Sequence, residues 1–397
     1  MVRVPTGLYK RGNVLVDALH NAQREQLKKI GVMTDDAPLK VSFRAPFANR
    51  MGMRVVLSDD VSSLEFSPDL AGILGFDADV KYSGHEDYID FANTVLYVKV
   101  KITANDGTNL TADAAVGPAN LFLHSLFSQV DISLNGTLVT PSTNTYPYRA
   151  MFETLLSYGE DSKKSLLTSA LFYTDTAGRM DAVGFADAAT VNQGLAKRRT
   201  FARQSQEFDM MGRLHADLFF QERFMINEDA VKIKLIRSRD AFCLMVAAAK
   251  LKIIHASMFV RKVKLISWVC LAHAKTLKNG TAKYPIRRVV CKTFAVPQNY
   301  LDLTHDKLFS GQLPTRIVVG LVNNQAFNGD LGSNPFNFKH YNLSEIALYL
   351  DRQQQFALKP IQPDYTNGLY IRAYESLYRH RKAIQGRRTL HKSRRLC

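Results

Sequence analysis

The fold is decided by residues 120–158, NLFLHSLFSQVDISLNGTLVTPSTNTYPYRAMFETLLSY. In the middle of this stretch, apolar and polar residues alternate over Val130–Leu134, and the dipeptide Asn135-Gly136 separates this run from Thr137–Val139. Asn-Gly between two alternating runs is the strongest short-range hairpin signal, because both turn residues adopt a positive φ that Asn tolerates and Gly adopts freely. Apolar runs with helical spacing flank the hairpin. The stretch therefore predicts a hairpin within a packed β framework, with a short helix on each side.

Similar patterns occur along most of the chain. Alternation predicts strands at Val95–Ile102, Phe208–Phe219, Val231–Ile236 and Leu251–Ile266. Further strands are expected at Leu39–Phe43, Met53–Leu57, Arg287–Val296, Arg316–Val322 and Leu343–Leu350. Helical spacing or capping signals predict helices at Val14–Ile30, Leu70–Leu74, Val269–Leu277 and Asp364–Leu377. Two polar stretches, Thr174–Gly194 and Val322–Asn342, predict long surface loops. Short strands, few helices and long loops favour a mainly β protein built of β-sandwiches or jelly rolls over a parallel α/β sheet.

The length predicts more than one domain, because single cores stop growing at roughly 250–300 residues and this chain has 397. The two β-rich series divide it into residues 81–245 and 246–375. Residues 1–80 differ from them in composition, and residues 376–397 form a basic tail that we expect to be disordered. The two series share no residue-level identity, so the sequence supports a duplication only weakly.

Composition limits the class of protein. With 46% hydrophobic residues the chain can bury a large core, and it contains no apolar run of about 18 residues that could span a membrane. The first residues lack the apolar core and cleavage site of a secretory signal, so we expect an intracellular protein that is neither secreted nor bound to a membrane. The cysteines are widely spaced and predict free thiols rather than a metal or redox motif; they are Cys243, Cys270, Cys291 and Cys397.

The sequence offers little that points to catalysis. It contains no phosphate-binding loop, no dinucleotide-binding motif, no zinc-protease motif and no nucleophile elbow. His215 stands two residues from Asp217, but a solvated polar stripe on a strand explains this spacing better than an active pair. Asp59-Asp60 is typical of a turn rather than of a metal site, and Cys243 is typical of a buried small hydrophobe. We therefore expect no catalytic, metal-binding or cofactor-binding residues, and no small-molecule substrate.

The net charge of +16 points to a polyanionic partner, but half of this excess lies in the tail. Smaller basic patches occur at Lys197-Arg198-Arg199 and Arg287-Arg288. The tail is the nucleic-acid candidate, although a solvated or non-native extension explains it more simply and no aromatic residue follows Tyr378. The tail residues concerned are Arg379, Arg381, Lys382, Arg387, Arg388, Lys392, Arg394 and Arg395.

A resemblance to a known family covers residues 84–374. The phrases that carry it include GHEDYIDFANTVLYVKVKITANDGTNL, the hairpin stretch, DMMGRLHADLFFQERFMIN, VKIKLIRSRDAFCLM, LFSGQLPTRIVVG and NPFNFKHYNLSEIALYLD. They resemble the capsid proteins of Maverick/Polinton transposable elements and the related adintoviruses. This resemblance implies a hexon-like major capsid protein with two tandem jelly rolls, which assembles as homotrimers with other capsid proteins into an icosahedral virion shell.

Both ends depart from the family pattern. Residues 1–80 look like part of a different small protein of the same elements, and the pattern breaks after Tyr374, so that the second jelly roll would be incomplete and leave an unpaired edge. Three hypotheses therefore stay open: a shell protein in the virion, nucleus or cytoplasm, a nucleic-acid-binding protein that acts through its tail, and a non-functional relic of an integrated element. An enzyme with an unfamiliar site is a fourth, which the missing motifs disfavour.

Overall fold

A computed structural model of the chain describes most of its residues from Tyr88 to Tyr378. The described residues are 41–42, 56–57, 61–65, 67–68, 73–78, 88–185, 190–226, 231–305, 308, 314–350, 353–354 and 360–378. The chain divides into two compact units, Met1–Ser62 and Ser63–Cys397. In the first unit, β1 (Val41–Ser42) pairs antiparallel with β2 (Val56–Leu57), which confirms both predicted strands. The predicted helix Val14–Ile30 and the Asp59-Asp60 turn lie outside the described residues.

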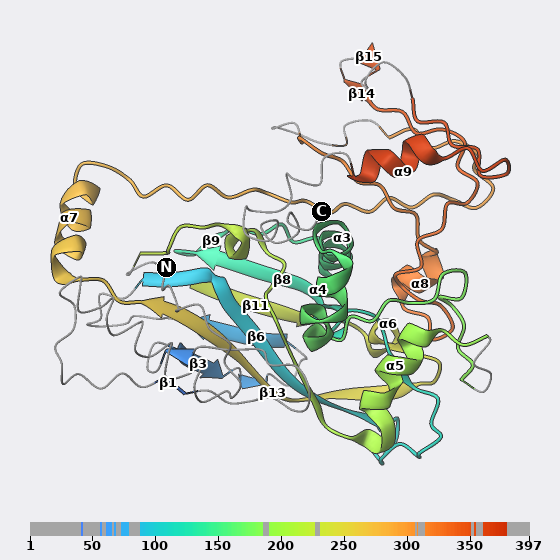
Figure 1. Cartoon of the computed structure of the whole chain (residues 1–397), viewed down its shortest axis with the longest axis horizontal. Helices are drawn as coiled ribbons and strands as arrows, with labels where there is room; N and C mark the ends of the chain where they lie inside the picture. The colour runs from blue at the N-terminus through green and yellow to red at the C-terminus, as the bar shows by residue number, and fades with distance from the viewer. Residues whose placement is uncertain are drawn as a thin grey trace, which may run out of the picture. The chain divides into compact units, whose positions relative to one another are not determined.

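The long strand β6 (Tyr88–Ala104) organises a four-stranded sheet in the order β10-β6-β13-β3 (Figure 1). Its partners are β10 (Phe208–Gly212), β13 (Ala249–Val263) and β3 (Val61–Glu65). The alternating residues of β6 confirm the predicted inward face, since Leu96, Val98, Val100 and Ile102 are all fully buried. Burial of one face is what the strict alternation of apolar and polar residues dictates.

A β-bulge in β13 interrupts its alternation. Ile253 pairs with Val100 and His255 pairs with Lys99, so that Ile254 is one residue more than the partner strand needs. Because successive side chains of a strand point to opposite faces, one extra residue changes which positions face the core. Leu251 faces the core before the bulge and Ala256 after it, while Ile254 is exposed.

The second large sheet contains the predicted hairpin. Its order is β4-β5-β11-β8-β9, and its strands are β4 (Ser67–Pro68), β5 (Ile73–Ala78), β11 (Val231–Arg237), β8 (Phe127–Leu134) and β9 (Thr137–Leu138). Ser133 pairs with Leu138 and Leu134 with Thr137 across the turn. Asn135 and Gly136 have φ angles of 47° and 78°, so the turn has the two positive φ values that its sequence predicts.

The predicted helix Leu70–Leu74 is wrong. Ile73–Ala78 is instead strand β5, which pairs antiparallel along β11, with Leu74 opposite Leu235 and Phe76 opposite Ile233. Pairing with a buried neighbouring strand outweighs the local capping signals in Ser67-Pro68, which form an edge strand where proline is tolerated. Strand β5 thus lies in the second unit, Ser63–Cys397, and the domain division expected at 80/81 stays a prediction. The divisions at 245/246 and 375/376 stay predictions.

The two sheets share one hydrophobic core, and we name the part of the sheets within residues 63–263, together with this core, the sandwich. Inward-facing residues of both sheets belong to a single cluster, for example Val98 of β6 and Ile132 of β8. Short elements close its ends: β7 (Gly117–Pro118), α2 (Phe122–Ser125), α3 (Tyr146–Ser157), α4 (Glu160–Lys164), η1 (Leu166–Ala170), α5 (Gln193–Ala202), η2 (Arg203–Ser205), η3 (Asp217–Phe220), α6 (Asp240–Cys243) and β12 (Leu244–Met245). α2 and α3 confirm the two helices predicted around the hairpin.

After β13 the chain changes character. It forms α7 (Ser267–Leu277), α8 (Asn324–Asn328), β14 (Tyr349–Leu350), β15 (Gln353–Gln354) and α9 (Ile371–Tyr378). Between α7 and α8 runs an extended stretch, residues 278–322, which we name the arm (Figure 1). The predicted strands Arg287–Val296 and Arg316–Val322 are wrong, because no described residue of the arm has strand pairing. α7 confirms its predicted helix, and the described residues as a whole form a mainly β protein with short helices.

Candidate functional site

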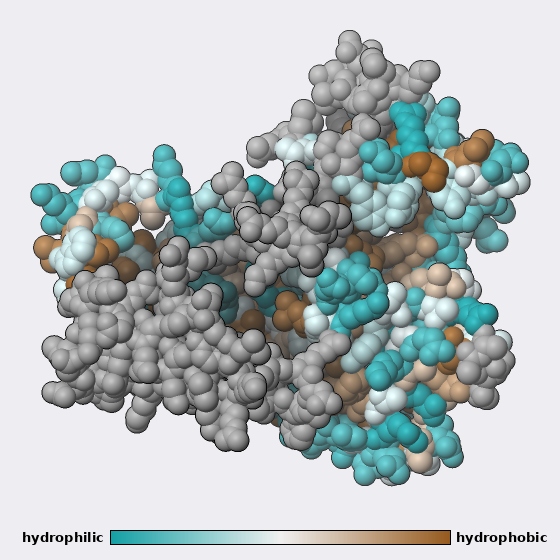
Figure 2. All heavy atoms as spheres, in the orientation of Figure 1, coloured by the Kyte–Doolittle hydropathy of each residue, from teal (hydrophilic) through white to brown (hydrophobic). Residues whose placement is uncertain are grey.

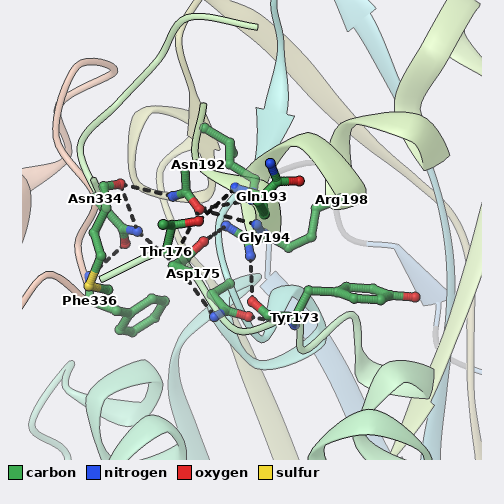
Figure 3. A network of polar contacts seen from close by, with 12 residues as sticks. Tyr173, Asp175, Thr176, Asn192, Gln193, Gly194, Arg198, Asn334 and Phe336 are labelled. Atoms are coloured by element: carbon green, nitrogen blue, oxygen red, sulfur yellow. Dashed lines mark hydrogen bonds and ion pairs between the residues drawn. The ribbon is translucent and has the colours of Figure 1, made fainter. Parts of the chain in front are cut away.

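A buried polar network joins the two stretches predicted as surface loops. We name Asp175, Asn192, Arg198 and Asn334 the clasp (Figure 3). Asn334 Nδ2 donates to Asp175 Oδ2 (3.1 Å) and to the Met180 carbonyl oxygen (3.2 Å). Both Asn192 and Asn334 are fully buried, so the two stretches meet at residues that are shielded from solvent. The clasp therefore ties the chain beyond the arm to the sandwich.

Arg198 of α5 holds the sandwich side of the clasp. Its guanidinium donates to the carbonyl oxygens of Pro118 (2.8 Å) and Tyr173 (2.9 Å) and to Asp175 Oδ1 (2.8 Å). The planar fork of arginine suits three acceptors in fixed directions. Burial lowers the pKa of Arg198, although Asp175 opposes this effect. A charge in this position needs its partner, because a buried ion that loses its counter-ion is strongly destabilising.

Asn192 starts α5 and shapes the loop before it. Its side-chain oxygen accepts from the N–H groups of Gly194 (3.2 Å) and Leu195 (3.4 Å), as an N-cap does, and also from Thr176 (3.1 Å). Position 194 has no room for a side chain, since a Cβ there would lie 2.7 Å from both Asp175 Oδ1 and the Thr174 carbonyl oxygen. The predicted loop thus ends in a helix whose first turn touches the clasp.

Asp181 adds a second attachment for the same stretch. It accepts from the Asn334 N–H (2.9 Å) and from Asn337 Nδ2 (2.6 Å), and it pairs with Lys339 (2.9 Å). Burial alone would raise the pKa of Asp181, but these hydrogen bonds and Lys339 outweigh it and lower the pKa. The carboxylate is therefore held in its charged form where it anchors the chain.

Aromatic packing completes this attachment. The ring of Phe336 lies edge-on to Tyr148 (5.8 Å between centroids) and Phe242, and Phe327 stacks on Tyr148 at 5.3 Å. Phe338 stacks on Phe152 at 4.9 Å. Offset and edge-on aromatic pairs add about 0.5–1.5 kcal/mol beyond the area that they bury. Helix α3 is thus covered by residues more than a hundred and fifty positions away in the sequence.

A second buried group, the Arg149 cluster, holds the arm itself. It consists of Arg149, Glu153, His215 and Asp217. Arg149 donates to Asp217 Oδ1 (2.5 Å) and Glu153 Oε1 (3.0 Å), and His215 Nδ1 donates to Glu153 Oε2 (2.6 Å). The backbone N–H of Val289 donates to Asp217 Oδ1 (3.2 Å), while its carbonyl oxygen accepts from Arg149 (3.4 Å). Side chains of the sandwich thus take the place of a neighbouring strand for this arm residue.

The pKa values of the two carboxyl groups in the Arg149 cluster shift in opposite directions. Burial would raise the pKa of Glu153, but Arg149 and His215 outweigh it and lower the pKa. For Asp217 burial dominates and raises the pKa, with Arg149 opposing. A cavity of about 30 Å³ lies beside the cluster, lined among others by Tyr146 and Cys291. It can hold one or two water molecules and is far too small for an organic substrate.

Several predicted residues have a different environment from the one expected. His215 is buried against Glu153, so the interpretation as a solvated polar stripe is wrong. The strand predicted at Phe208–Phe219 ends at Gly212, and the residues after it turn into the core. Arg198 is fully buried, which removes it from the basic patch predicted at Lys197-Arg198-Arg199. Cys243 agrees with the prediction, because it is buried and burial raises the pKa of its thiol to about 12.

The remaining predicted sites can be placed briefly. The eight basic residues of the tail, Arg379 to Arg395, lie outside the described residues, as does Asp59-Asp60. Among the described residues, no group of three or more His, Cys, Asp or Glu side chains could hold a metal ion. In the same part of the chain, no helix has the length and apolar character needed to cross a bilayer.

Sequence reasoning missed both polar clusters. Their members are ordinary polar residues spread over residues 149–339, and no local spacing connects them. One signal was available for Asn192, because an Asn three residues before Leu195 at the start of a polar helix is typical of an N-cap. The clasp and the Arg149 cluster are hydrogen-bonded within the protein, and their chemistry is to fix backbone positions.

Comparisons with known proteins give distant similarities. No protein-family model matches the sequence. The chain is 25% identical over 305 residues to an uncharacterised protein of Caenorhabditis elegans, and the match covers 73% of this chain and 69% of the worm protein.

Three solved structures are similar over part of their length. The first is PBCV-1 VP54 fitted into a reconstruction of the virophage Sputnik, with a TM-score of 0.30 and 11% identity over 58% of this chain and 47% of that one. The second is the Sputnik virophage, with a TM-score of 0.35 and 12% identity over 59% of this chain and 55% of that one. The third is the mavirus major capsid protein, with a TM-score of 0.29 and 13% identity over 59% of this chain and 55% of that one. The chain spans about half the length of each of these structures.

Proposed function

We propose that the chain is a structural protein that assembles into a capsid-like shell, and that it is a major capsid protein of the Maverick/Polinton type. Its partners are then other copies of the same chain, with which it forms trimers, and other capsid proteins. Its location is the virion. The resemblance of residues 84–374 to that family supports this assignment. The role needs a rigid framework and contact surfaces rather than a reaction centre.

The observation that carries the proposal is the surface of the arm. Its backbone is extended, and large apolar side chains along it are exposed, including Val296 (50%), Leu301 (103%) and Val319 (56%). Large apolar side chains gathered on one exposed stretch mark a surface that another protein covers. An extended stretch whose described residues have no strand partner is also a template for strand pairing with a neighbouring chain.

The attachment of the arm to the sandwich supports the same function. The clasp and the Arg149 cluster fix the two ends of the arm on the sandwich, which leaves the exposed residues between them in a defined place. We propose that residues 246–375 form the second, incomplete jelly roll, and that the arm gains strand partners when copies associate. Strand pairing across subunits would supply the hydrogen bonds that the predicted strands Arg287–Val296 and Arg316–Val322 need.

Light scattering on the purified full chain, with electron microscopy of the same sample, tests this proposal. We expect trimers and larger particles, and a folded chain that stays strictly monomeric would overturn it. The double variant Val296→Lys, Leu301→Lys places charges on the arm and should reduce the assembled fraction. The matched control Leu138→Lys, Leu166→Lys changes two exposed leucines of the sandwich and should assemble as the unmodified chain does.

A further inference from the structure

The positive charge of the chain lies in two stretches, and only one of them is the tail. Residues 241–301 contain no Asp or Glu and eleven Lys or Arg residues. The tail from Ser376 holds eight more and also has no acidic residue. Outside these two stretches the chain has 33 of its 52 basic residues and all of its 36 acidic residues. The rest of the chain is thus slightly acidic. The structure describes every residue of the first stretch.

Eight of these eleven basic residues lie within α7 or near it in the sequence, and we name residues 261–288 the basic segment. They are Arg261, Lys262, Lys264, Lys275, Lys278, Lys283, Arg287 and Arg288, and all except the half-buried Lys262 are exposed. Asp90 lies 3.9 Å from Arg261 and offsets that charge. Tyr88 of β6 fixes the helix, since its hydroxyl bonds His273 Nδ1 (3.0 Å) and the two rings stack. The basic residues are therefore displayed on a surface with a defined attachment.

Within the basic segment stands the single tryptophan of the chain. Trp268 is 69% exposed on α7, and Leu271, one turn further, is also exposed. Figure 2 shows polar and apolar side chains next to each other at the end of the molecule that carries α7. An exposed indole among Lys and Arg can stack on a nucleic-acid base while the cations contact phosphates. In a duplex the base faces are already stacked, so an exposed indole fits single strands better.

A membrane surface is the other polyanion that such a segment could meet. Helices that lie on membranes separate an apolar face from a charged face along their length. The apolar side chains of α7 show no such separation, and only Lys275 adds a positive charge within the helix. Most of the charges lie on extended chain before and after α7, which suits a linear phosphate backbone better than a flat bilayer.

We infer that the basic segment is a binding surface for single-stranded nucleic acid, in which Lys and Arg contact the phosphates and Trp268 stacks on a base. This surface is separate from the tail in the sequence, and it shares residues 278–288 with the arm. Charge and stacking contribute differently to binding. Phosphate contacts release counter-ions and make affinity depend on salt, whereas stacking changes affinity with little effect on that dependence.

Fluorescence anisotropy with a labelled oligothymidylate of about 30 nucleotides tests the inference on the full chain, between about 50 and 200 mM NaCl. The triple variant Lys275→Gln, Lys278→Gln, Lys283→Gln should weaken binding roughly 10- to 100-fold. It should also lower the slope of log affinity against log salt concentration by about 2, because each phosphate contact with a single strand contributes about 0.7 to this slope. Trp268→Ala should weaken binding roughly tenfold at an unchanged slope.

Controls separate this surface from its rivals. Lys164→Gln, Lys197→Gln, Lys232→Gln removes three lysines from other elements and should leave binding unchanged, as should deletion of the tail. Binding that disappears with the tail, or that neither variant of the basic segment reduces, would overturn the inference. So would equal affinity for a duplex with no effect of Trp268→Ala, or binding to phosphatidylserine vesicles without binding to the oligonucleotide.

Discussion

The sandwich and the arm carry the same kind of sequence but differ in structure. β6 alternates apolar and polar residues and is paired on both sides, and its apolar positions are fully buried. Arg287–Val296 is equally rich in β-branched residues, yet it runs without strand pairing and Val289 and Val290 are exposed. The difference teaches that a composition typical of strands is not sufficient to form one. Whether the stretch becomes a strand depends on a backbone partner elsewhere.

The two regions are also stabilised in different ways. Strand ladders and a common core hold the sandwich, whereas a few side-chain hydrogen bonds and aromatic contacts hold the arm at its two ends. Regions with few buried contacts open at lower free energy than the core. We therefore expect the arm to detach from the sandwich without global unfolding, and the variants below test this expectation from the largest effect to the smallest.

Replacing Arg198 should have the largest effect, because it damages the sandwich itself. Arg198→Met leaves the buried Asp175 carboxylate without its counter-ion and three acceptors without their donor. Breaking a buried pair in this way costs about 3–5 kcal/mol in the free energy of unfolding. Urea denaturation followed by circular dichroism measures it. The control is Arg199→Met on the same helix, whose loss should cost under about 1 kcal/mol.

Replacing Asn334 should release only the attached chain. Asn334→Ala removes two donated bonds of the clasp, at about 1–3 kcal/mol for the buried groups left without partners. Hydrogen exchange should show lost protection in residues 330–338 and unchanged protection in β6. Asn328→Ala, which removes an exposed amide bonded only within α8, is the matched control. Equal loss of protection in both regions would contradict the difference between sandwich and arm.

His124 gives the smallest expected effect, through pH. Burial, with His215 adding to it, holds the pKa of His124 well below 6.5. The unfolded chain therefore takes up a proton near pH 6.5 that the folded chain refuses, and folding stability falls as the pH drops below that value. The loss cannot exceed the free energy of protonating a solvated histidine, about 1.4 kcal/mol at pH 5.5.

His124→Asn should remove this pH dependence, because Asn can still bond the Tyr146 hydroxyl without taking up a proton. Urea midpoints at pH 7.5 and pH 5.5 for both proteins measure the effect. His305→Asn, an exposed histidine of the arm, should behave as the unmodified chain. If the urea midpoint of the His124 variant shifts between pH 7.5 and pH 5.5 as much as that of the unmodified chain, His124 is not the titrating group.

Much of the sandwich could be predicted from the sequence because its signals are local. The Asn135-Gly136 turn, the alternation in Val95–Ile102 and the helix after β13 each depend on neighbours within a few residues. Strand β5 was missed because pairing with β11, more than 150 residues later, outweighs its own capping signals. The predicted arm strands failed for the opposite reason, since a correct local pattern lacks its distant partner.

The candidate site was beyond sequence reasoning for a related cause. The spacing of His215 and Asp217 is compatible with a strand face, and only the fold shows that the strand has ended before them. Asn334 belongs to an Asn- and Phe-rich stretch that is typical of an exposed loop, and its burial depends on Asp175 far earlier in the chain. Polar residues reveal their role only when their partners are known.

The bulge at Ile254 has a consequence for the history of this protein. Without Ile254, Ile253 and His255 would still face Val100 and Lys99, and every later position would keep its side of the sheet. Losing or gaining one residue here leaves the core intact, whereas the same change within residues 95–102 would turn the strand inside out. When this chain is aligned with distant relatives, a one-residue gap belongs at Ile254.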